Sequence, residues 1–274
     1  MAITKFIPEV WSAYILERYV ATNVFAGLLD RKYEGDARQG NTIHIPGVVP
    51  PVVKDYKAAG RTTSADDISD TGVDILINQE KSIDFQVDDI DNAQANHELL
   101  PLYTDAAGEA LTIDADKWIA NLLVAGGTVL AGAVPTTGDQ AFDVFKNARK
   151  SLQKGNVPDD GRVAVVNAEL EALLYGADSK LTNFDKSGGT DGLRNATIGG
   201  LLNFRVVVSN NLPGVNSPQG VFFHPRAAAF ISQITEMEGM RAQNSFKDRV
   251  RGLHVYGGKV IKPTGVVVFN PAGS

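Results

Sequence analysis

The sequence predicts an α+β fold with a long extended hairpin, a long helix and a small α/β layer. Residues 41–91 predict the hairpin, because apolar and polar residues alternate along a return arm that begins at Val73. Residues 92–125 predict the helix, because their apolar residues recur at helical spacing. The α/β layer is predicted by the apolar run 163–166 and the helical pattern that follows it.

The composition is that of a soluble protein with a substantial core. The chain has 274 residues, 43% of them hydrophobic and 21% charged, which fits one large domain or two smaller ones. The formal net charge of −6 argues against a nucleic-acid-binding protein. The absence of cysteine removes disulfides, thiolate nucleophiles and cysteine metal sites. No apolar run approaches the roughly 18 residues of a membrane span, and the first residues do not resemble a signal peptide.

The first element is an amphipathic N-terminal arm over residues 8–33. Pro8 suits a helix start, and Gly35 and Gly40 close the arm before the hairpin. The apolar stripe consists of Val10, Trp11, Tyr14, Ile15, Tyr19, Val24, Leu28 and Leu29.

The hairpin follows, with an outgoing arm at 41–53, a polar tip at 54–72 and a return arm at 73–91. Three prolines bar the outgoing arm from the middle of a sheet. The return arm could span on the order of 60 Å at about 3.3 Å per residue, whereas strands usually have about 5 to 6 residues. A long edge hairpin with one apolar face needs a surface, and we expect another copy of the protein to supply it.

Charge is unevenly distributed between the hairpin and the C-terminal region. From Asp66 to Asp91 there are nine acidic residues and only Lys81 as a base, while Arg241 to Lys262 contains six basic residues and only Asp248 as an acid. Two solvated faces would account for this pattern. The alternative is that the acidic hairpin of one copy meets the basic region of its neighbour, which would set register and association rate.

The long helix is expected to begin with Asn92 as its N-cap and to stop at Gly126-Gly127. Pro101 must kink or restart it. Twenty-five helical residues would span about 38 Å, enough to form the backbone of a domain.

A second helix is expected from an N-cap at Asp139 to Gly155, and a short one over 168–175 with Asn167 as its cap. Residues 176–192 are expected to form a loop. The remaining expected elements are strands at 163–166, 204–209, 221–224 and 266–269, a helix at 225–231 and an antiparallel sheet section at 236–262.

The sequence offers no convergent catalytic or metal-binding motif. The four histidines, His44, His97, His224 and His254, have no metal-ligand spacing and are expected to be structural. Ser187–Gly192 and Gly257-Gly258-Lys259 do not match a phosphate-binding loop and are expected to be turns. Glu236 and Glu238 would share a strand face as solvated or ion-paired residues. No Gly-x-Ser-x-Gly elbow supports a catalytic triad, although a triad is spatial and has no fixed spacing. We therefore predict no enzyme, no catalytic, cofactor-binding or metal-binding residue, and no cofactor.

Several stretches, taken in this order, resemble the major capsid (coat) proteins of tailed bacteriophages, which share the Hong Kong 97 type capsid fold. The resemblance covers nearly the whole chain, and the order of the stretches is more specific than any one of them. They are Phe6–Ser12, Gly40–Pro46, Ile198–Ser209, Asn211–Pro213 and Tyr256–Val260.

The resemblance implies a division of the chain into regions with known places in a shell. It implies an N-terminal arm at 1–35, an extended loop (E-loop) at 36–91, a peripheral domain with the spine helix at 92–162, an axial domain at 163–230, and a late sheet at 231–274 that returns to the peripheral domain. Because the sequence starts directly at the arm, a separate scaffolding protein is expected. A cross-link from Lys54 or Lys57 is not expected, because it would need a carboxylate in a dry pocket.

The resemblance also implies the function and the partners. The subunit would self-assemble as homopentamers and homohexamers into the icosahedral head that encloses the double-stranded DNA of a tailed phage. Further partners would be the scaffolding protein, a portal and a decoration protein, with only weak non-specific contact with packaged DNA and no membrane. The protein would be in the virion, and in the host cytoplasm during assembly. An encapsulin-like compartment shell and a soluble α/β enzyme are the alternatives.

Overall fold

The computed structural model describes residues 23–35, 41–47, 52–58, 60–63, 65, 72–89, 99–176, 200–214, 216–242 and 245–271. Its helices are α1 (Phe25–Leu28), α3 (Leu99–Gly126), α4 (Gly138–Lys154) and α5 (Ala168–Leu174), with 3-10 turns η1 (Lys32–Gly35), η2 (Pro225–Ala227) and η3 (Pro263–Gly265). Its strands are β1 (Thr42–Ile45), β2 (Val73–Leu76), β3 (Gln79–Asp88), β4 (Thr128–Val129), β5 (Val163–Val166), β6 (Gly200–Leu201), β7 (Phe204–Val208), β8 (Gly220–Phe223), β9 (Ala228–Arg241), β10 (Lys247–Val260) and β11 (Val266–Phe269).

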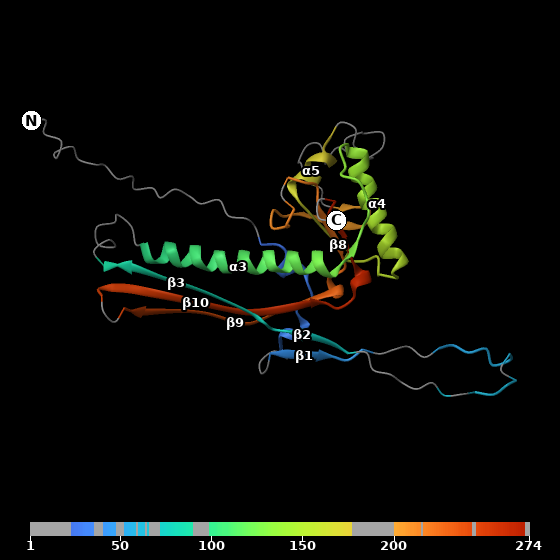
Figure 1. The fold of residues 1–274 in the computed structure, drawn as a ribbon, viewed down its shortest axis with the longest axis horizontal. Helices are drawn as coiled ribbons and strands as arrows, with labels where there is room; N and C mark the ends of the chain where they lie inside the picture. The colour runs from blue at the N-terminus through green and yellow to red at the C-terminus, as the bar shows by residue number, and fades with distance from the viewer. Residues whose placement is uncertain are drawn as a thin grey trace, which may run out of the picture.

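One layer consists of α3 lying along a three-stranded antiparallel sheet of order β3-β10-β9 (Figure 1). The 28 residues of α3 span about 42 Å at 1.5 Å per residue. Trp118 of α3 meets the ring of Tyr256 of β10 edge-on at 5.4 Å. The Tyr256 hydroxyl donates to Asp114 Oδ2 at 3.0 Å. The predicted spine helix and late antiparallel sheet therefore form one unit.

The ends of α3 refine the sequence prediction. Pro101 lies in the first turn of α3, where its missing N–H would have no helical partner, so the helix needs no kink there. The helix ends at Gly126, as predicted, and both glycines also serve packing. A Cβ at Gly126 would lie 2.7 Å from a Val260 methyl, and one at Gly127 would lie 2.6 Å from a Val268 methyl. The glycines thus let β10 and β11 approach the end of α3.

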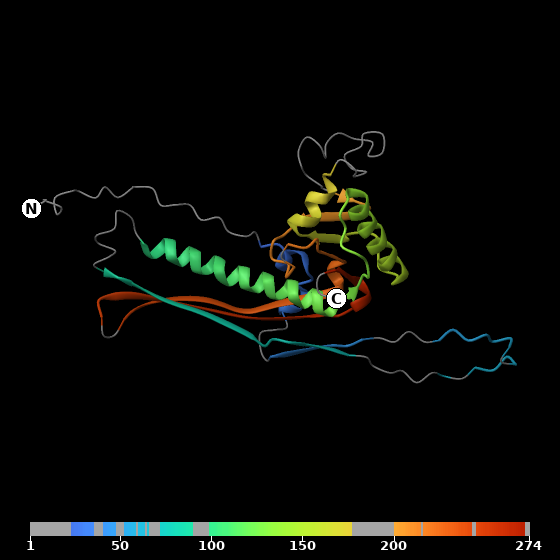
Figure 2. The same cartoon turned by 45° about the horizontal axis from the view of Figure 1, so that its top comes forward.

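The second layer is a six-stranded mixed sheet of order β4-β11-β8-β5-β7-β6, packed against α4 and α5 (Figure 2). The predicted stripe of α4 is confirmed, since Ala141, Phe145, Ala148 and Leu152 are fully buried. The N-cap of α4 is Thr137, whose side chain accepts from Gln140 N, and not Asp139, which lies in the first helical turn. Asn167 caps α5 as predicted.

Two elements connect the predicted regions of the chain. Helix α4 belongs to the predicted region 92–162, and its apolar face packs on the six-stranded sheet. Strand β11 belongs to the predicted region 231–274, and it pairs with β8 and β4 of the six-stranded sheet. Strand order between distant segments is a tertiary property, which local patterns do not encode.

The predicted helix 225–231 is wrong. Only the single turn η2 forms, and β9 begins at Ala228, where it pairs with Val260 of β10. The alanines favour a helix locally, but the long ladder to β10 overrides this weak preference. The predicted turn at Gly257-Gly258 is also wrong, because both residues lie inside β10.

The hairpin is shorter as a paired element than predicted. Strands β1 and β2 pair over Thr42–Ile45 and Val73–Leu76, but the rest of the return arm, β3, leaves the hairpin and joins β10. We use "arm" for the hairpin from residue 41 to residue 76. Both views show its described part projecting away from the two layers (Figures 1 and 2). Most of the predicted N-terminal stripe, Asn92, His97 and Ser187–Gly192 lie outside the described residues.

Candidate assembly interface

The base of the arm is fixed to the body by a small apolar cluster. Ile75 and Ile77 are buried against Ala229 and Ile231 of β9 and Val255 of β10. The backbone also contributes, since Ile77 N donates to the Asn41 carbonyl at 2.8 Å. The arm therefore projects from a rigid attachment.

Gly257 makes the close approach at this attachment possible. A Cβ at this position would lie 2.3 Å from the Leu76 carbonyl oxygen and 2.6 Å from the Ile77 Cα. Both of these atoms belong to the backbone, so no side-chain rotation could relieve the contact. Only glycine lets the arm cross β10 at this distance.

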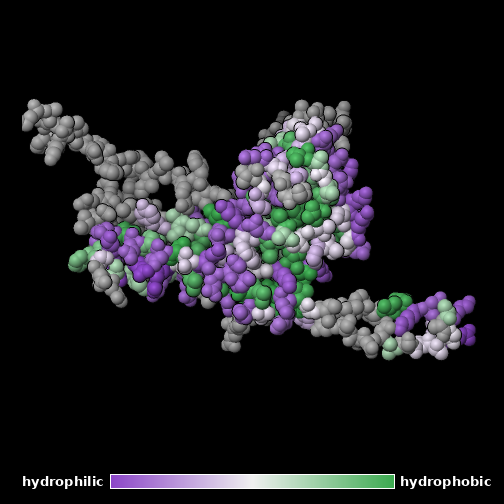
Figure 3. All heavy atoms as spheres, viewed as in Figure 1, coloured by the Kyte–Doolittle hydropathy of each residue, from purple (hydrophilic) through white to green (hydrophobic). Residues whose placement is uncertain are grey.

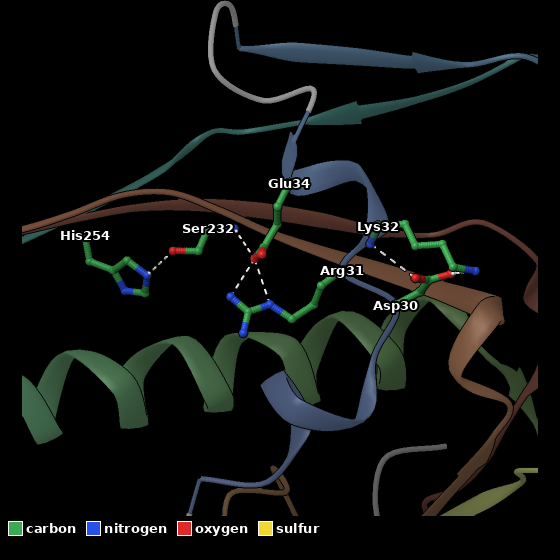
Figure 4. Close-up of polar contacts among 6 residues, drawn as sticks. All are labelled: Asp30, Arg31, Lys32, Glu34, Ser232 and His254. Atoms are coloured by element: carbon green, nitrogen blue, oxygen red, sulfur yellow. Dashed lines mark hydrogen bonds and ion pairs between the residues drawn. The ribbon is translucent and has the colours of Figure 1, made fainter.

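The segment before η1, together with η1, is hydrogen-bonded to β9 near the base of the arm (Figure 4). Asp30 N donates to the Ala228 carbonyl, and Phe230 N donates to the Asp30 carbonyl. Glu34 accepts from Ser232 N at 3.2 Å and pairs with Arg31 at 2.6 Å. Ser232 Oγ lies 3.1 Å from His254 Nε2. The N-terminal segment thus reaches the sheet that also carries the arm.

Asp116 joins α3, α1 and the loop after β7. Its side chain is fully buried, and Oδ1 accepts from the backbone N–H groups at the start of α1, with Phe25 N at 2.7 Å. Its other oxygen accepts from Asn211 Nδ2 at 2.8 Å. A carboxylate at a helix N-terminus is stabilised by the unpaired N–H groups there. This one residue connects the two layers and the N-terminal segment.

The charge complementarity predicted between copies is largely satisfied within one chain. Arg249 of β10 forms an ion pair with Asp84 of β3. At the end of β9, a terminal guanidinium nitrogen of Arg241 lies 2.7 Å from Asp89 Oδ1. Lys247 lies 3.4 Å from Asp88. The hydrogen bond from Arg249 lowers the pKa of Asp84 below its ordinary value. The intermolecular version of this prediction is therefore wrong for β3, whose acids and the bases of β10 stabilise the register of one sheet.

Exposed apolar side chains mark the arm and the far end of the long sheet. Val52 is 72% exposed and Val53 is 98% exposed on the arm, and Phe246, between β9 and β10, is 85% exposed. The space-filling view shows hydrophobic atoms on the projecting arm (Figure 3). A single exposed apolar side chain is ordinary, but adjacent ones such as Val52 and Val53 are typical of surfaces that meet another protein.

The described histidines take structural positions. His44 pairs across the hairpin with Asp74 at 2.6 Å. His224 caps η2, and His254 lies against the ring of Tyr256 at 4.7 Å. Within the described ranges no group of three or more His, Asp or Glu side chains is placed to hold a metal ion.

The predicted carboxylate pair is part of the sheet surface. Glu238 lies 2.8 Å from Arg251, and Glu236 is exposed on the same face. Among the described helices, none is both long and apolar enough to span a bilayer.

Comparison with known proteins agrees with this architecture. The sequence profile of phage capsid proteins matches residues 73–269, well over half of the chain. A structure from Mycobacterium phage Che8 is 58% identical, covers 100% of both chains and has a TM-score of 0.93. The capsid structure of cyanophage P-SCSP1u is 16% identical over 98% of this chain and 94% of that one, with a TM-score of 0.79.

A third solved structure, a virus-like particle from Pyrococcus furiosus, is 12% identical over 90% of this chain and 92% of that one, with a TM-score of 0.59. At this identity the likeness concerns the fold alone. A search of curated proteins finds no match.

A helix lying on a long sheet, a separate α/β layer and a projecting arm make up a fold shared with solved phage capsid structures, which confirms the predicted fold class. The chain belongs to the phage capsid protein family. It is a component of the virion shell, and the compartment and enzyme alternatives are disfavoured.

Proposed function

We propose that this subunit assembles with copies of itself as pentamers and hexamers of an icosahedral head, and that the arm lies on a neighbouring subunit. The observation that carries the proposal is the arm itself. It leaves the body at a fixed base, and exposes Val52, Val53 and Tyr56. Burying such side chains against a neighbour contributes about 25 cal/mol per Å² of apolar area. Closed shells arise when such contacts repeat with symmetry.

The regions of the fold suggest the place of each part in the shell. We assign residues 1–35 to the N-terminal arm of the capsid fold, which is distinct from the hairpin called the arm here. We assign residues 36–77, which include that hairpin, to the E-loop. We assign α3 with β3, β9 and β10 to the peripheral domain. The axial domain then contains the six-stranded sheet with α4 and α5, and so it includes β11. This division follows the two sheets and their apolar cores.

The partners beyond the subunit itself are proposed on the family resemblance alone. They are a separate scaffolding protein, a portal and a decoration protein, with weak non-specific contact with packaged DNA. A structural role without catalysis is supported by membership of a capsid family.

Deletion of the arm tip tests the proposal. Replacing Lys54–Gly72 with a short Gly-Ser turn should leave a folded subunit that forms no shells, because the base cluster at Ile75 and Ile77 is retained. Circular dichroism would report the fold, and electron microscopy with sedimentation velocity would report assembly. Particles like those of the wild type from the deletion variant would refute the role of the arm.

A further inference from the structure

A basic groove lies at the base of the arm. Two adjoining hollows of about 500 and 200 Å³ share Arg226, just after β8, and Lys262, just after β10. The larger hollow is also lined by Lys32 and by the ends of β1 and β2. The smaller one extends toward His224 and the end of α4. We call the surface around Lys32, Arg226 and Lys262 the basic groove.

Backbone hydrogen bonds hold the walls of the basic groove in place. The N–H groups of Ile261 and Lys262 both donate to the Ala227 carbonyl, at 2.8 and 2.9 Å. His224 N donates to the Gly265 carbonyl at 3.1 Å, which ties η2 to η3. The wall that carries Lys32 is fixed by the bonds of Asp30 to β9. The groove is therefore preorganised, which lowers the entropic cost of binding a partner.

Within the described ranges, ion pairs offset only part of the positive charge of the groove. Asp30 lies 3.3 Å from Lys32 and offsets that cation. In the described part of the chain, neither Arg226 nor Lys262 has an ion-pair partner. Burial lowers the pKa of His224, and the nearby charge of Arg226 lowers it further. The groove therefore fits an anionic partner.

The sequence of the arm supplies a matching anionic segment. Most described acids between residues 73 and 89 already have basic partners, as Asp74 of the arm has His44 and Asp84 of β3 has Arg249. The limb of the tip at residues 62–72 instead carries three aspartates and no basic residue. The opposite limb, residues 54–61, carries Lys54, Lys57 and Arg61 against one acid, Asp55, so the net charges of the two limbs differ in sign. In both views the described part of the tip lies far along the arm from its own base (Figures 1 and 2).

We propose that the basic groove binds the acidic limb, residues 62–72, of the arm of a second copy. The proposal rests on the proposed self-assembly, and it identifies the surface of the neighbouring subunit that the tip of the arm contacts. Because the groove lies at the arm base, each subunit would receive one tip where its own arm begins, and the contact would repeat from copy to copy. Such a contact is heterologous, as a closed ring requires. Opposite charges across it would fix the register between neighbours.

Charge reversal in both partners tests the proposal. Arg226→Glu with Lys262→Glu, and separately Asp66→Lys with Asp67→Lys, should each reduce shell yield at least tenfold at low ionic strength. The two pairs combined in one chain should restore the yield to within about threefold of the wild type, since opposite charges face each other again. Yield would be measured by sedimentation velocity and electron microscopy.

Two controls separate this proposal from simpler explanations. Lys117→Glu with Lys150→Glu makes the same charge change at exposed positions of α3 and α4, outside the groove, and should keep wild-type yield. The milder Arg226→Gln with Lys262→Gln should reduce yield in the same direction, and thermal unfolding should show a folded subunit for every variant. Equal losses in the control, wild-type yield from the groove variant, or no restoration in the combined variant would overturn the proposal while wild-type shells still form. No wild-type shells at all would instead overturn the proposed function.

Discussion

Gly257→Ala should uncouple the arm from the body while leaving the body folded. The added Cβ would lie 2.3 Å from the Leu76 carbonyl oxygen, whereas ordinary contact begins near 3.4 Å, so the backbone at β2 must move by about 1 Å. Overpacking of this kind costs about 1–3 kcal/mol. The strand β2 is roughly 13 Å long at about 3.3 Å per residue, so a shift of about 1 Å over its length tilts the arm. At a point on the arm roughly 36 Å away, the same tilt displaces the chain by about 3 Å.

Such a displacement exceeds the tolerance of a packed interface, so assembly should fail before folding does. Each inter-subunit contact weakened by about 1.4 kcal/mol lowers its association constant tenfold. The assay is shell yield by sedimentation velocity, with circular dichroism and urea unfolding of the free subunit. Gly239→Ala is the matched control, because a Cβ at this position of β9 meets nothing within 4 Å. Wild-type shell yield from Gly257→Ala would show that the close approach at Gly257 does not set the position of the arm.

Three further predictions concern the stability of the free subunit. Asp116→Ala removes the carboxylate that accepts from the N–H groups at the start of α1 and from the Asn211 amide. Urea unfolding should therefore show a free energy of unfolding lower by about 3–5 kcal/mol, with a smaller decrease for Asp116→Asn. A decrease below about 1 kcal/mol for Asp116→Ala would contradict the role of Asp116. Thr137→Ala should lower the free energy of unfolding by about 1 kcal/mol because α4 loses its N-cap, and Asp139→Ala should lower it by less. A larger loss of stability from Asp139→Ala in thermal unfolding would show that Asp139 is the cap. Burial lowers the pKa of His254, although the charge of Asp114 acts in the opposite direction. Below about pH 6.5, the ordinary pKa of histidine, His254 is therefore protonated more fully in the unfolded chain than in the folded chain. Stability should therefore be full above this pH and fall as the pH decreases, and His254→Gln should flatten the fall; an unchanged pH profile in that variant would exclude His254 as a contributor.

The sequence predicted the elements whose patterns are local. The long helix, the stripe of α4 and the cap at Asn167 depend on neighbours within a few residues, and the structure confirms them. The predicted helix at 225–231 failed because pairing with β10, far along the chain, decides the conformation of this alanine-rich stretch. The glycines at 257 and 258 were assigned to a turn because their real cause, a strand crossing at short distance, has no local signature.

The assembly surface was predicted in part. Alternation and prolines predicted an extended arm, and the exposed valines of the arm agree with it. The point where the return arm leaves the hairpin was missed, since alternation continues from β2 into β3 and does not report which strand is the partner. The same ambiguity led the acids of β3 to be assigned to contacts between copies. The basic groove was missed because its residues come from three separate segments.

Electron microscopy of the purified full chain, supported by light scattering and performed with and without its genomic neighbours, distinguishes a shell-forming subunit from a protein that stays monomeric. We expect hollow icosahedral shells, or rings of five and six subunits. A monodisperse particle near the 29.3 kDa of one chain under every condition would contradict it.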